Sequence, residues 1–159
     1  MKEIKGDLLE LAFSGKFDII CHGCNCQKTM GAGIAAQIKY HYKAAYTVDV
    51  KDKRQPLDRL GNWTVAKVKT KVIKPLFIYN LYTQFVPGND FMLSALDLAL
   101  FKLNIHINEL EQQEGKKYSI AFPQIGAGIG GGNWEDIKKV IGNRLGMKDV
   151  TIVYYDKKK

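Results

Sequence analysis

The sequence predicts an α/β sandwich on a largely parallel central sheet, and three observations lead to this prediction. Segments with the apolar pattern of strands alternate with segments that have the 3.6-residue periodicity of helices. The 159 residues suit one compact domain, 1–159, and no linker, internal repeat or low-complexity segment divides them. Two glycine-rich loops each follow a predicted strand and precede a predicted helix, as in open α/β folds that bind ligands.

The first half of the chain begins with a short segment near Ile4, which predicts a short strand. Residues 17–22 form an apolar run typical of a buried strand. Residues 32–46 repeat apolar side chains at helical spacing and predict one helix. The polar stretch 47–61 predicts a loop with a helical turn, and residues 62–69, rich in β-branched side chains, predict the next strand.

The second half continues the alternation of strands and helices. Residues 76–82 predict a strand, and residues 92–113 carry leucine and isoleucine at the spacing of a long amphipathic helix. Residues 118–122 and 150–155 predict two further short strands. Between them, Asn133 is a suitable N-cap for a helix that continues to residue 145 and has acidic side chains in its first turn.

Charge and composition narrow the classes of protein. The 24 Lys and Arg against 16 Asp and Glu leave a net charge of +8, which suggests an anionic partner. Some of these lysines are explained by contact with solvent alone, because Lys67, Lys69 and Lys71 alternate as on the solvent face of a strand and residues 157–159 form a lysine tail. No apolar run approaches the roughly 20 residues of a membrane helix and no hydrophobic signal core begins the chain, so we expect a cytoplasmic protein without membrane contact.

All three cysteines lie in one short stretch, at Cys21, Cys24 and Cys26. An odd number of cysteines in a cytoplasmic chain argues against a disulfide framework. His22 is the one nearby candidate for a fourth zinc ligand, but successive strand residues point to opposite faces, so Cys21 and His22 do not converge easily. We expect no metal site and no cofactor.

The two glycine loops predict phosphate binding. Glycine lets a ligand approach the backbone, and the N-terminus of a following helix offers free N–H groups to an anion. The first loop covers residues 23–35 and the second covers 126–133, which holds five glycines in its first seven residues. The second loop also satisfies a dinucleotide-binding glycine spacing, but it lies in the last quarter of the chain with only one strand beyond it. A dehydrogenase is therefore not the preferred reading.

These residues, in this order, resemble the macrodomain family, the ADP-ribose-binding α/β fold. The matching segments are Gly6-Asp7-Leu8-Leu9, residues 19–26, residues 30–35, residues 123–129, Trp134 and Val153-Tyr154. The resemblance covers nearly the whole chain and implies a three-layer α/β/α sandwich with a mixed, largely parallel sheet. The first-loop sequence His22-Gly23-Cys24-Asn25-Cys26 is most similar to the branch that dephosphorylates ADP-ribose 1″-phosphate.

The resemblance also implies a set of ligand contacts, drawn from the opening motif, both loops and the closing strand. The set is Asp7, Leu8, Asn25, Met30, Gly31, Ala32, Gly33, Ile34, Gln124, Gly126, Ala127, Gly128, Ile129, Gly130 and Tyr154. In the family Asp7 would accept from adenine, Tyr154 would pack near it and Asn25 would bind the distal ribose. The residues alone allow other roles, namely a helix N-cap for Asp7, a packed aromatic for Tyr154 and a turn for Asn25.

His22 and Asp90 are the candidate catalytic residues. A histidine titrates near neutral pH, so His22 could protonate a leaving oxygen or attack phosphorus. Asp90 follows a predicted strand, where it could orient water or partner His22. A structural role for His22 and a helix N-cap role for Asp90 are the alternatives.

Two departures from the family bear on function. The branch that removes ADP-ribose from acidic side chains has a lysine where this chain has Gln84 and an aspartate where it has Gly130. We therefore expect a monomeric ADP-ribose 1″-phosphate phosphatase, a phosphoric monoester hydrolase whose partner is ADP-ribose or ADP-ribose 1″-phosphate. The alternatives are an ADP-ribosyl hydrolase acting on ADP-ribosylated protein or nucleic acid, a non-catalytic ADP-ribose reader, and simple nucleic-acid binding.

Overall fold

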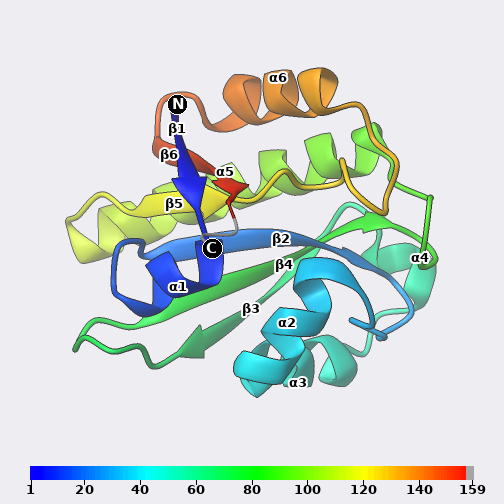
Figure 1. Cartoon of the computed structure of the whole chain (residues 1–159), viewed down its shortest axis with the longest axis horizontal. Coiled ribbons are helices and arrows are strands. Elements are labelled where there is room, and N and C mark those ends of the chain that lie inside the picture. The colour runs from blue at the N-terminus through cyan, green and yellow to red at the C-terminus, as the bar shows by residue number, and fades with distance from the viewer. Residues whose placement is uncertain (157–159) are drawn as a thin grey trace.

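The computed structural model describes residues 1–156 and places six strands in one sheet of order β1-β6-β5-β2-β4-β3 (Figure 1). The strands are β1 (Lys2–Gly6), β2 (Ile19–Asn25), β3 (Trp63–Val68), β4 (Leu76–Gln84), β5 (Ser119–Phe122) and β6 (Asp149–Tyr155). All neighbouring strands are parallel except β3, which pairs antiparallel with β4 at one edge. The mixed, largely parallel sheet predicted from the sequence is confirmed.

Helices cover both faces of this sheet. They are α1 (Leu8–Phe13), α2 (Gly33–His41), α3 (Lys43–Lys51), α4 (Pro56–Arg59), α5 (Leu93–Glu114) and α6 (Trp134–Leu145). Figure 1 shows α5 and α6 on one side of the sheet and α1, α2 and α3 on the other, which confirms the three-layer class. Within residues 1–156, no helix is long and apolar enough to cross a membrane.

The central strand β2 explains why two cores form. Its side chains alternate between faces, so Ile19 and Cys21 pack under α5 and α6 while Ile20 and Cys24 pack under α1 and α2. All four side chains are almost fully buried. A strand buried on both faces reads as a continuous apolar run, which is why residues 17–22 gave a clear signal.

The structure differs from the sequence prediction on the α2–α3 side. The single helix expected over 32–46 is two helices, because Tyr42 leaves helical geometry (φ −133°, ψ 75°) and buries its ring in the core. Helix α3 then continues to Lys51, into the stretch expected to be a loop. Helix α1, which was not predicted as a separate element, is only six residues long and is capped by Asp7. The expected helical turn within 47–61 is α4.

Candidate functional site

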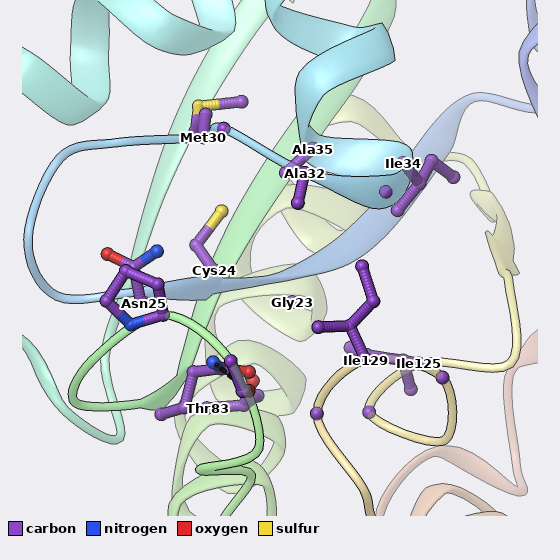
Figure 2. A pocket seen from close by; sticks show the side chains of 18 of the residues that line it. Gly23, Cys24, Asn25, Met30, Ala32, Ile34, Ala35, Thr83, Ile125 and Ile129 are labelled. Carbon is purple, nitrogen blue, oxygen red and sulfur yellow. Dashed lines mark hydrogen bonds between the residues drawn. The ribbon is translucent and has the colours of Figure 1, made fainter.

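The carboxyl ends of β2, β4 and β5 open into a cleft of about 580 Å³. It is lined by residues 23–25, 29–35, 83, 84, 87, 88, 123–126 and 128–130. Figure 2 shows the cleft between β2, the beginning of α2 and the second glycine loop. The two glycine loops therefore meet at one edge of the sheet, as open α/β folds require of a ligand site.

The N-terminus of α2 forms one wall of the cleft. Ala32 occupies the N-cap position in extended geometry, and no side chain caps the helix. Gly33, Ile34 and Ala35, whose N–H groups belong to the first helical turn, all line the cleft. An uncapped helix end carries unpaired N–H donors and a partial positive charge, so this wall suits an anion.

The chain before α2 is held in an unusual backbone conformation. Lys28 and Met30 adopt positive φ values of 60° and 41°, although neither is glycine. The Met30 side chain is 2% exposed and packs in the α1–α2 core, which anchors the loop. Lys39 donates to the backbone oxygen of Thr29 at 3.2 Å, and Arg59 donates to that of Cys26 at 2.8 Å. Backbone strain maintained by such contacts is common at binding sites.

Asn25 lines the cleft at the end of β2, but its amide serves the loop itself. Its oxygen accepts from the Gln27 N–H at 2.8 Å, and its nitrogen donates to the Thr29 hydroxyl at 2.8 Å. The turn role that the residue type allows is therefore present. Its contact with a distal ribose remains a prediction.

The second glycine loop rests on one aromatic ring. A Cβ atom on Gly126 or Gly132 would collide with the Phe91 ring, and Gly126 also has a φ of +75°. The backbone N–H of Phe91 donates a hydrogen bond to the Gly130 oxygen at 3.1 Å, which holds the loop against this residue. Close packing on Phe91 is therefore one reason for the high glycine density.

The same loop also presents free donors. Within residues 1–156, the N–H groups of Gly128, Ile129 and Gly130 have no hydrogen-bond acceptor, and all three residues line the cleft. Gly131 and Gly132, by contrast, donate to backbone oxygens of the loop. The middle of the loop can therefore receive an anion.

Helix α6 does not supply an N-terminus to the site, although the sequence pattern suggested that each loop would be followed by one. Asn133 caps α6 by accepting from the Asp136 N–H at 3.1 Å. The first turn of α6 does not line the cleft. The expectation that both following helices point at the ligand holds for α2 alone.

Ile129 spans the mouth of the cleft. Its side chain is 60% exposed and points toward Ile34 at the beginning of α2 (Figure 2). Its Cδ1 lies 3.7 Å from the position that a Cβ on Gly33 would occupy. The tip of the second loop thus approaches the beginning of α2, and Gly33 leaves room for it.

Asp90 lies beside the cleft and closes the connection after β4. Its carboxylate accepts from the N–H groups of Phe85 at 2.9 Å and Val86 at 3.0 Å. The N-cap of α5 is Met92, so Asp90 is not the helix cap that the sequence allowed. Asp90 does not line the cleft, whereas its loop neighbour Gly88 does.

The structure places His22 away from the cleft, and its catalytic role remains a prediction. The side chain is fully buried on the α3 side of β2, outside the cleft lining. Its Nε2–H donates to the Asn80 amide oxygen at 2.6 Å, because the Asn80 nitrogen itself donates to the Ala45 oxygen. Burial lowers the pKa of His22 to about 4, so the ring is neutral at pH 7. His22 and Asp90 are not brought together in the cleft.

His22 instead begins a buried polar chain beneath the first loop. Asn80 donates to the Thr64 hydroxyl at 3.0 Å, and that hydroxyl is 2.8 Å from the Tyr82 hydroxyl. Tyr82 donates to Asp49 at 2.8 Å, and Asp49 forms an ion pair with the fully buried Arg59. The chain ends at the first loop, where Arg59 holds the Cys26 oxygen.

Asp7 and Leu8 do not line the main cleft. The Asp7 carboxylate caps α1 by accepting from the Leu9 N–H at 3.0 Å and the Glu10 N–H at 3.1 Å. Asp7 also lines a second cleft of about 340 Å³, together with His41 at the end of α2. Leu8 is buried in the α1–α2 core. The N-cap role that the sequence allowed for Asp7 is present, and its contact with adenine remains a prediction.

Tyr154 and Ala127 are likewise outside the main cleft. The Tyr154 hydroxyl donates to Glu3 at 2.5 Å and accepts from the Trp134 indole N–H at 3.2 Å. Its ring packs edge-to-face on Trp134. The Ala127 N–H is bonded to the Gln124 oxygen within the loop.

Other predicted contacts do line the cleft: Asn25, Met30, Gly31, Ala32, Gly33, Ile34, Gln124, Gly126, Gly128, Ile129 and Gly130. The predicted contacts did not include the other residues of the lining, which are Gly23, Cys24, Thr29, Ala35, Thr83, Gln84, Pro87, Gly88, Pro123 and Ile125. Thr83 and Gln84 come directly after the predicted strand 76–82, so their position at its carboxyl end was the available signal.

The side chains around the cleft are almost free of ionisable groups. The Cys24 thiol is the one exception among the described lining residues, and burial raises its pKa well above the ordinary value. Cys21, Cys24 and Cys26 are free thiols. Within residues 1–156, no cluster of three or more His, Cys, Asp or Glu side chains could hold a metal ion. The polar groups that the lining offers to a ligand are therefore backbone N–H groups, amides and the hydroxyls of Thr29 and Thr83.

Comparison with known proteins places this geometry in a family. The Macro domain family matches residues 21–141. A 17.5 kDa protein encoded in the tk-vs intergenic region of Enterobacteria phage T4 is 35% identical over 157 residues, covering 98% of this chain and 97% of that protein. An ADP-ribose 1″-phosphate phosphatase of Meyerozyma guilliermondii is 25% identical, covering 94% and 97% of the two chains.

A second group of relatives carries a different name. A DNA ADP-ribosyl glycohydrolase of Mycobacterium tuberculosis is 28% identical over 94% of this chain and 40% of its own length. The solved macrodomain of Thermus aquaticus DarG superposes with a TM-score of 0.75 at 25% identity, covering 98% of this chain and 97% of that one. The sequence match over most of the chain and the shared fold agree, and the chain therefore belongs to the macro domain family.

Proposed function

We propose that the cleft binds ADP-ribose and that the chain hydrolyses ADP-ribose 1″-phosphate to ADP-ribose and inorganic phosphate. One observation carries the proposal. The uncapped N-terminus of α2 lies across the cleft from the free N–H groups of the second glycine loop. Two facing sets of backbone donors suit a ligand with several phosphate groups.

The contacts that the family resemblance predicts do not all lie in the main cleft. The main cleft, at about 580 Å³, is within the usual size of a small-molecule site. Asp7 and Tyr154, the family's adenine contacts, lie outside it. We therefore place the diphosphate and the distal ribose in the main cleft and the adenosine beyond it.

The proposed reaction is hydrolysis of a phosphate monoester. A water oxygen attacks phosphorus, the bond between phosphorus and ribose O1″ breaks, and O1″ takes up a proton. The residues of this chain contribute backbone N–H groups that stabilise the negative charge on the phosphoryl oxygens. The amide nitrogen of Gln84 is bonded to the Val86 and Gly88 oxygens, but its amide oxygen can accept a hydrogen bond from the ribose or the water.

The relatives support hydrolysis of an ADP-ribose derivative, and one of them is named for this reaction. Because the Cys24 thiol is the only ionisable side chain among the described lining residues, we expect kcat to change less than about threefold between pH 6.5 and 8.5. A bell-shaped profile centred near pH 7 would contradict this arrangement. The His22 pKa of about 4 is far below that range.

The experiment is to incubate the protein with ADP-ribose 1″-phosphate and measure released phosphate. Gly128→Val is the blocked variant, because a Cβ there meets nothing within 4 Å and a larger side chain would project into the cleft without disturbing the fold. Asn133→Ala is the matched control outside the cleft. Release by wild type and the control but not by Gly128→Val supports the proposal, and no release by wild type overturns it.

A second candidate is removal of ADP-ribose from nucleic acid. The relatives named DNA ADP-ribosyl glycohydrolase and the net charge of +8 favour it. Gln84 stands where the branch that acts on acidic side chains has a lysine, and its amide holds the Val86 and Gly88 oxygens, which counts against a lysine adduct but not against attack by a positioned water. Incubation with ADP-ribosylated DNA separates the two candidates, because only the second predicts release of ADP-ribose. Tight binding of ADP-ribose without turnover of either substrate would indicate a non-catalytic ADP-ribose-binding protein.

A further inference from the structure

An irregularity in the sheet places Thr83 at the floor of the cleft. On the pairing of β2 with β4, Cys24 lies opposite Tyr82 and Asn25 lies opposite Gln84. Thr83 is therefore an extra residue with no partner across the ladder, as in a β-bulge. Bulges redirect a side chain, and they are frequent next to binding sites.

The Thr83 side chain is buried and lines the cleft. It is 1% exposed, and Gly23 and Ile125 line the cleft with it; Figure 2 labels all three. A Cβ on Gly23 would lie 3.0 Å from the Thr83 hydroxyl oxygen and 3.3 Å from the nearest Ile125 carbon. Because Gly23 has no side chain, the β2 backbone lies directly against the buried Thr83 hydroxyl, at a point where both residues line the cleft.

The Thr83 hydroxyl has no hydrogen-bond partner anywhere in residues 1–156. Other threonine hydroxyls near the site are bonded, since Thr29 accepts from Asn25 and Thr64 accepts from Asn80. A buried hydroxyl without a partner costs free energy, so such a group in a binding cleft calls for a ligand atom.

We propose that the Thr83 hydroxyl forms a hydrogen bond with the distal ribose of the bound nucleotide and is a specificity-determining residue for that end of the ligand. This inference rests on the proposed function. Thr83 is adjacent to Gln84, which pairs with Asn25, the residue that the family resemblance assigns to the distal ribose. The family's adenine contacts, Asp7 and Tyr154, lie outside this cleft. A hydroxyl can donate and accept, as the hydroxyl groups of a ribose do.

The test replaces the hydroxyl while keeping the shape. Thr83→Val is nearly isosteric, and Thr83→Ser keeps the hydroxyl. We expect Thr83→Val to weaken ADP-ribose binding about five- to tenfold by calorimetry, the usual effect of one hydrogen bond, and Thr83→Ser to stay within about threefold of wild type. Binding of ADP, which lacks the distal ribose, should be the same in all three proteins.

Stability separates this role from a structural one. No protein hydrogen bond is lost in Thr83→Val, so its thermal midpoint should equal or exceed that of wild type. Equal ADP-ribose affinity for wild type and Thr83→Val, or an equal loss for ADP and ADP-ribose, would overturn the inference.

Phosphate release is measured on the same proteins, so that the two proposals can fail separately. If wild type binds ADP-ribose but releases no phosphate from ADP-ribose 1″-phosphate, the phosphatase proposal fails while the binding comparison still decides the role of Thr83. If wild type binds no ADP-ribose, both proposals fail.

Discussion

The two glycine loops have the same sequence pattern and different physical designs. Both follow a strand and precede a helix, but α2 after the first loop is uncapped and lines the cleft, whereas α6 after the second is capped by Asn133 and does not. The first loop offers a helix end to a ligand, and the second offers the free N–H groups of its own middle residues. The presence or absence of a capping side chain at the N-terminus of the following helix therefore distinguishes the two loops better than their glycine content does.

The supports of the two loops differ as well. Beneath the first loop lies the buried polar chain from His22 to Arg59. The second loop rests on the ring of Phe91. The position of the first loop should therefore depend on charge and pH, whereas that of the second should depend on shape.

The largest expected effect is at Arg59. Arg59→Met leaves the buried Asp49 carboxylate without its cation and frees the Cys26 oxygen, so we expect a loss of about 3–5 kcal/mol in the free energy of unfolding. Arg54→Met is the matched control, because Arg54 pairs with Asp52 from a partly exposed position. It should lose no more than about 1 kcal/mol. Urea unfolding of both variants measures the difference, and similar losses would show that the buried chain does not support the fold as described.

The next effect is the pH dependence of stability that comes from His22. Its pKa is about 4 in the folded chain and near 6.5 in the unfolded chain, so the unfolded chain binds the proton first as pH falls. The stability associated with the neutral ring is present above pH 6.5 and is lost progressively toward pH 4, by about 3 kcal/mol in total.

Two measurements check this prediction. The free energy of unfolding, measured with urea at pH 7 and pH 4.5, should change less with pH in His22→Gln than in wild type. The carboxylates titrate in both proteins, so their contribution cancels when the two changes are subtracted. An NMR titration of the imidazole should show no protonation above about pH 5. Protonation near pH 6.5 in the folded protein would place His22 in contact with solvent.

A third prediction compares two glycines within the second loop. Gly126→Ala introduces a Cβ at a φ of +75° and against the Phe91 ring, so we expect a loss of about 2 kcal/mol in stability and much weaker ADP-ribose binding. A Cβ on Gly128 meets nothing within 4 Å, so Gly128→Ala should keep wild-type stability. Thermal unfolding of the pair is the measurement, and equal midpoints would exclude packing on Phe91 as the reason for glycine at 126.

The sequence predicted the layers and most of the cleft because their signals are local. The apolar run before the first loop and the leucine spacing of 92–113 each report burial within a few residues. The break at Tyr42 and the extension of α3 to Lys51 were not predictable in this way, because they depend on a tertiary contact of the Tyr42 ring and on a polar helix.

The burial of His22 was not predictable for a related reason. His22 follows an apolar strand and precedes a glycine loop, which favoured a place in the site. The face on which it lies is decided by strand alternation together with Asn80, a residue 58 positions away. The polar stretch 47–61 likewise concealed Arg59, whose buried partners include Asp49 and the Cys26 oxygen. Partners such as Asn80 for His22 and Cys26 for Arg59 are distant in sequence and leave no local pattern.

The smallest expected change tests the comparison of the two loops most directly. Ala32→Asp places a carboxylate at the empty cap of α2, in extended geometry that lets it accept from the Ile34 or Ala35 N–H. It should raise the free energy of unfolding by about 1 kcal/mol and weaken ADP-ribose binding more than tenfold, because the new charge occupies the anion site. Asn133→Ala removes the cap of α6, so it should lower the free energy of unfolding by about 1 kcal/mol and leave the affinity for ADP-ribose unchanged.

These opposite signs distinguish a helix end kept free for a ligand from one used only for folding. Ala32→Asn separates the two contributions in Ala32→Asp, because it fills the cap without adding charge. It should match Ala32→Asp in thermal midpoint and fall between it and wild type in affinity. If Ala32→Asp binds ADP-ribose as tightly as wild type, the first turn of α2 does not hold the phosphates, and the free N–H groups of Gly128, Ile129 and Gly130 must hold them alone.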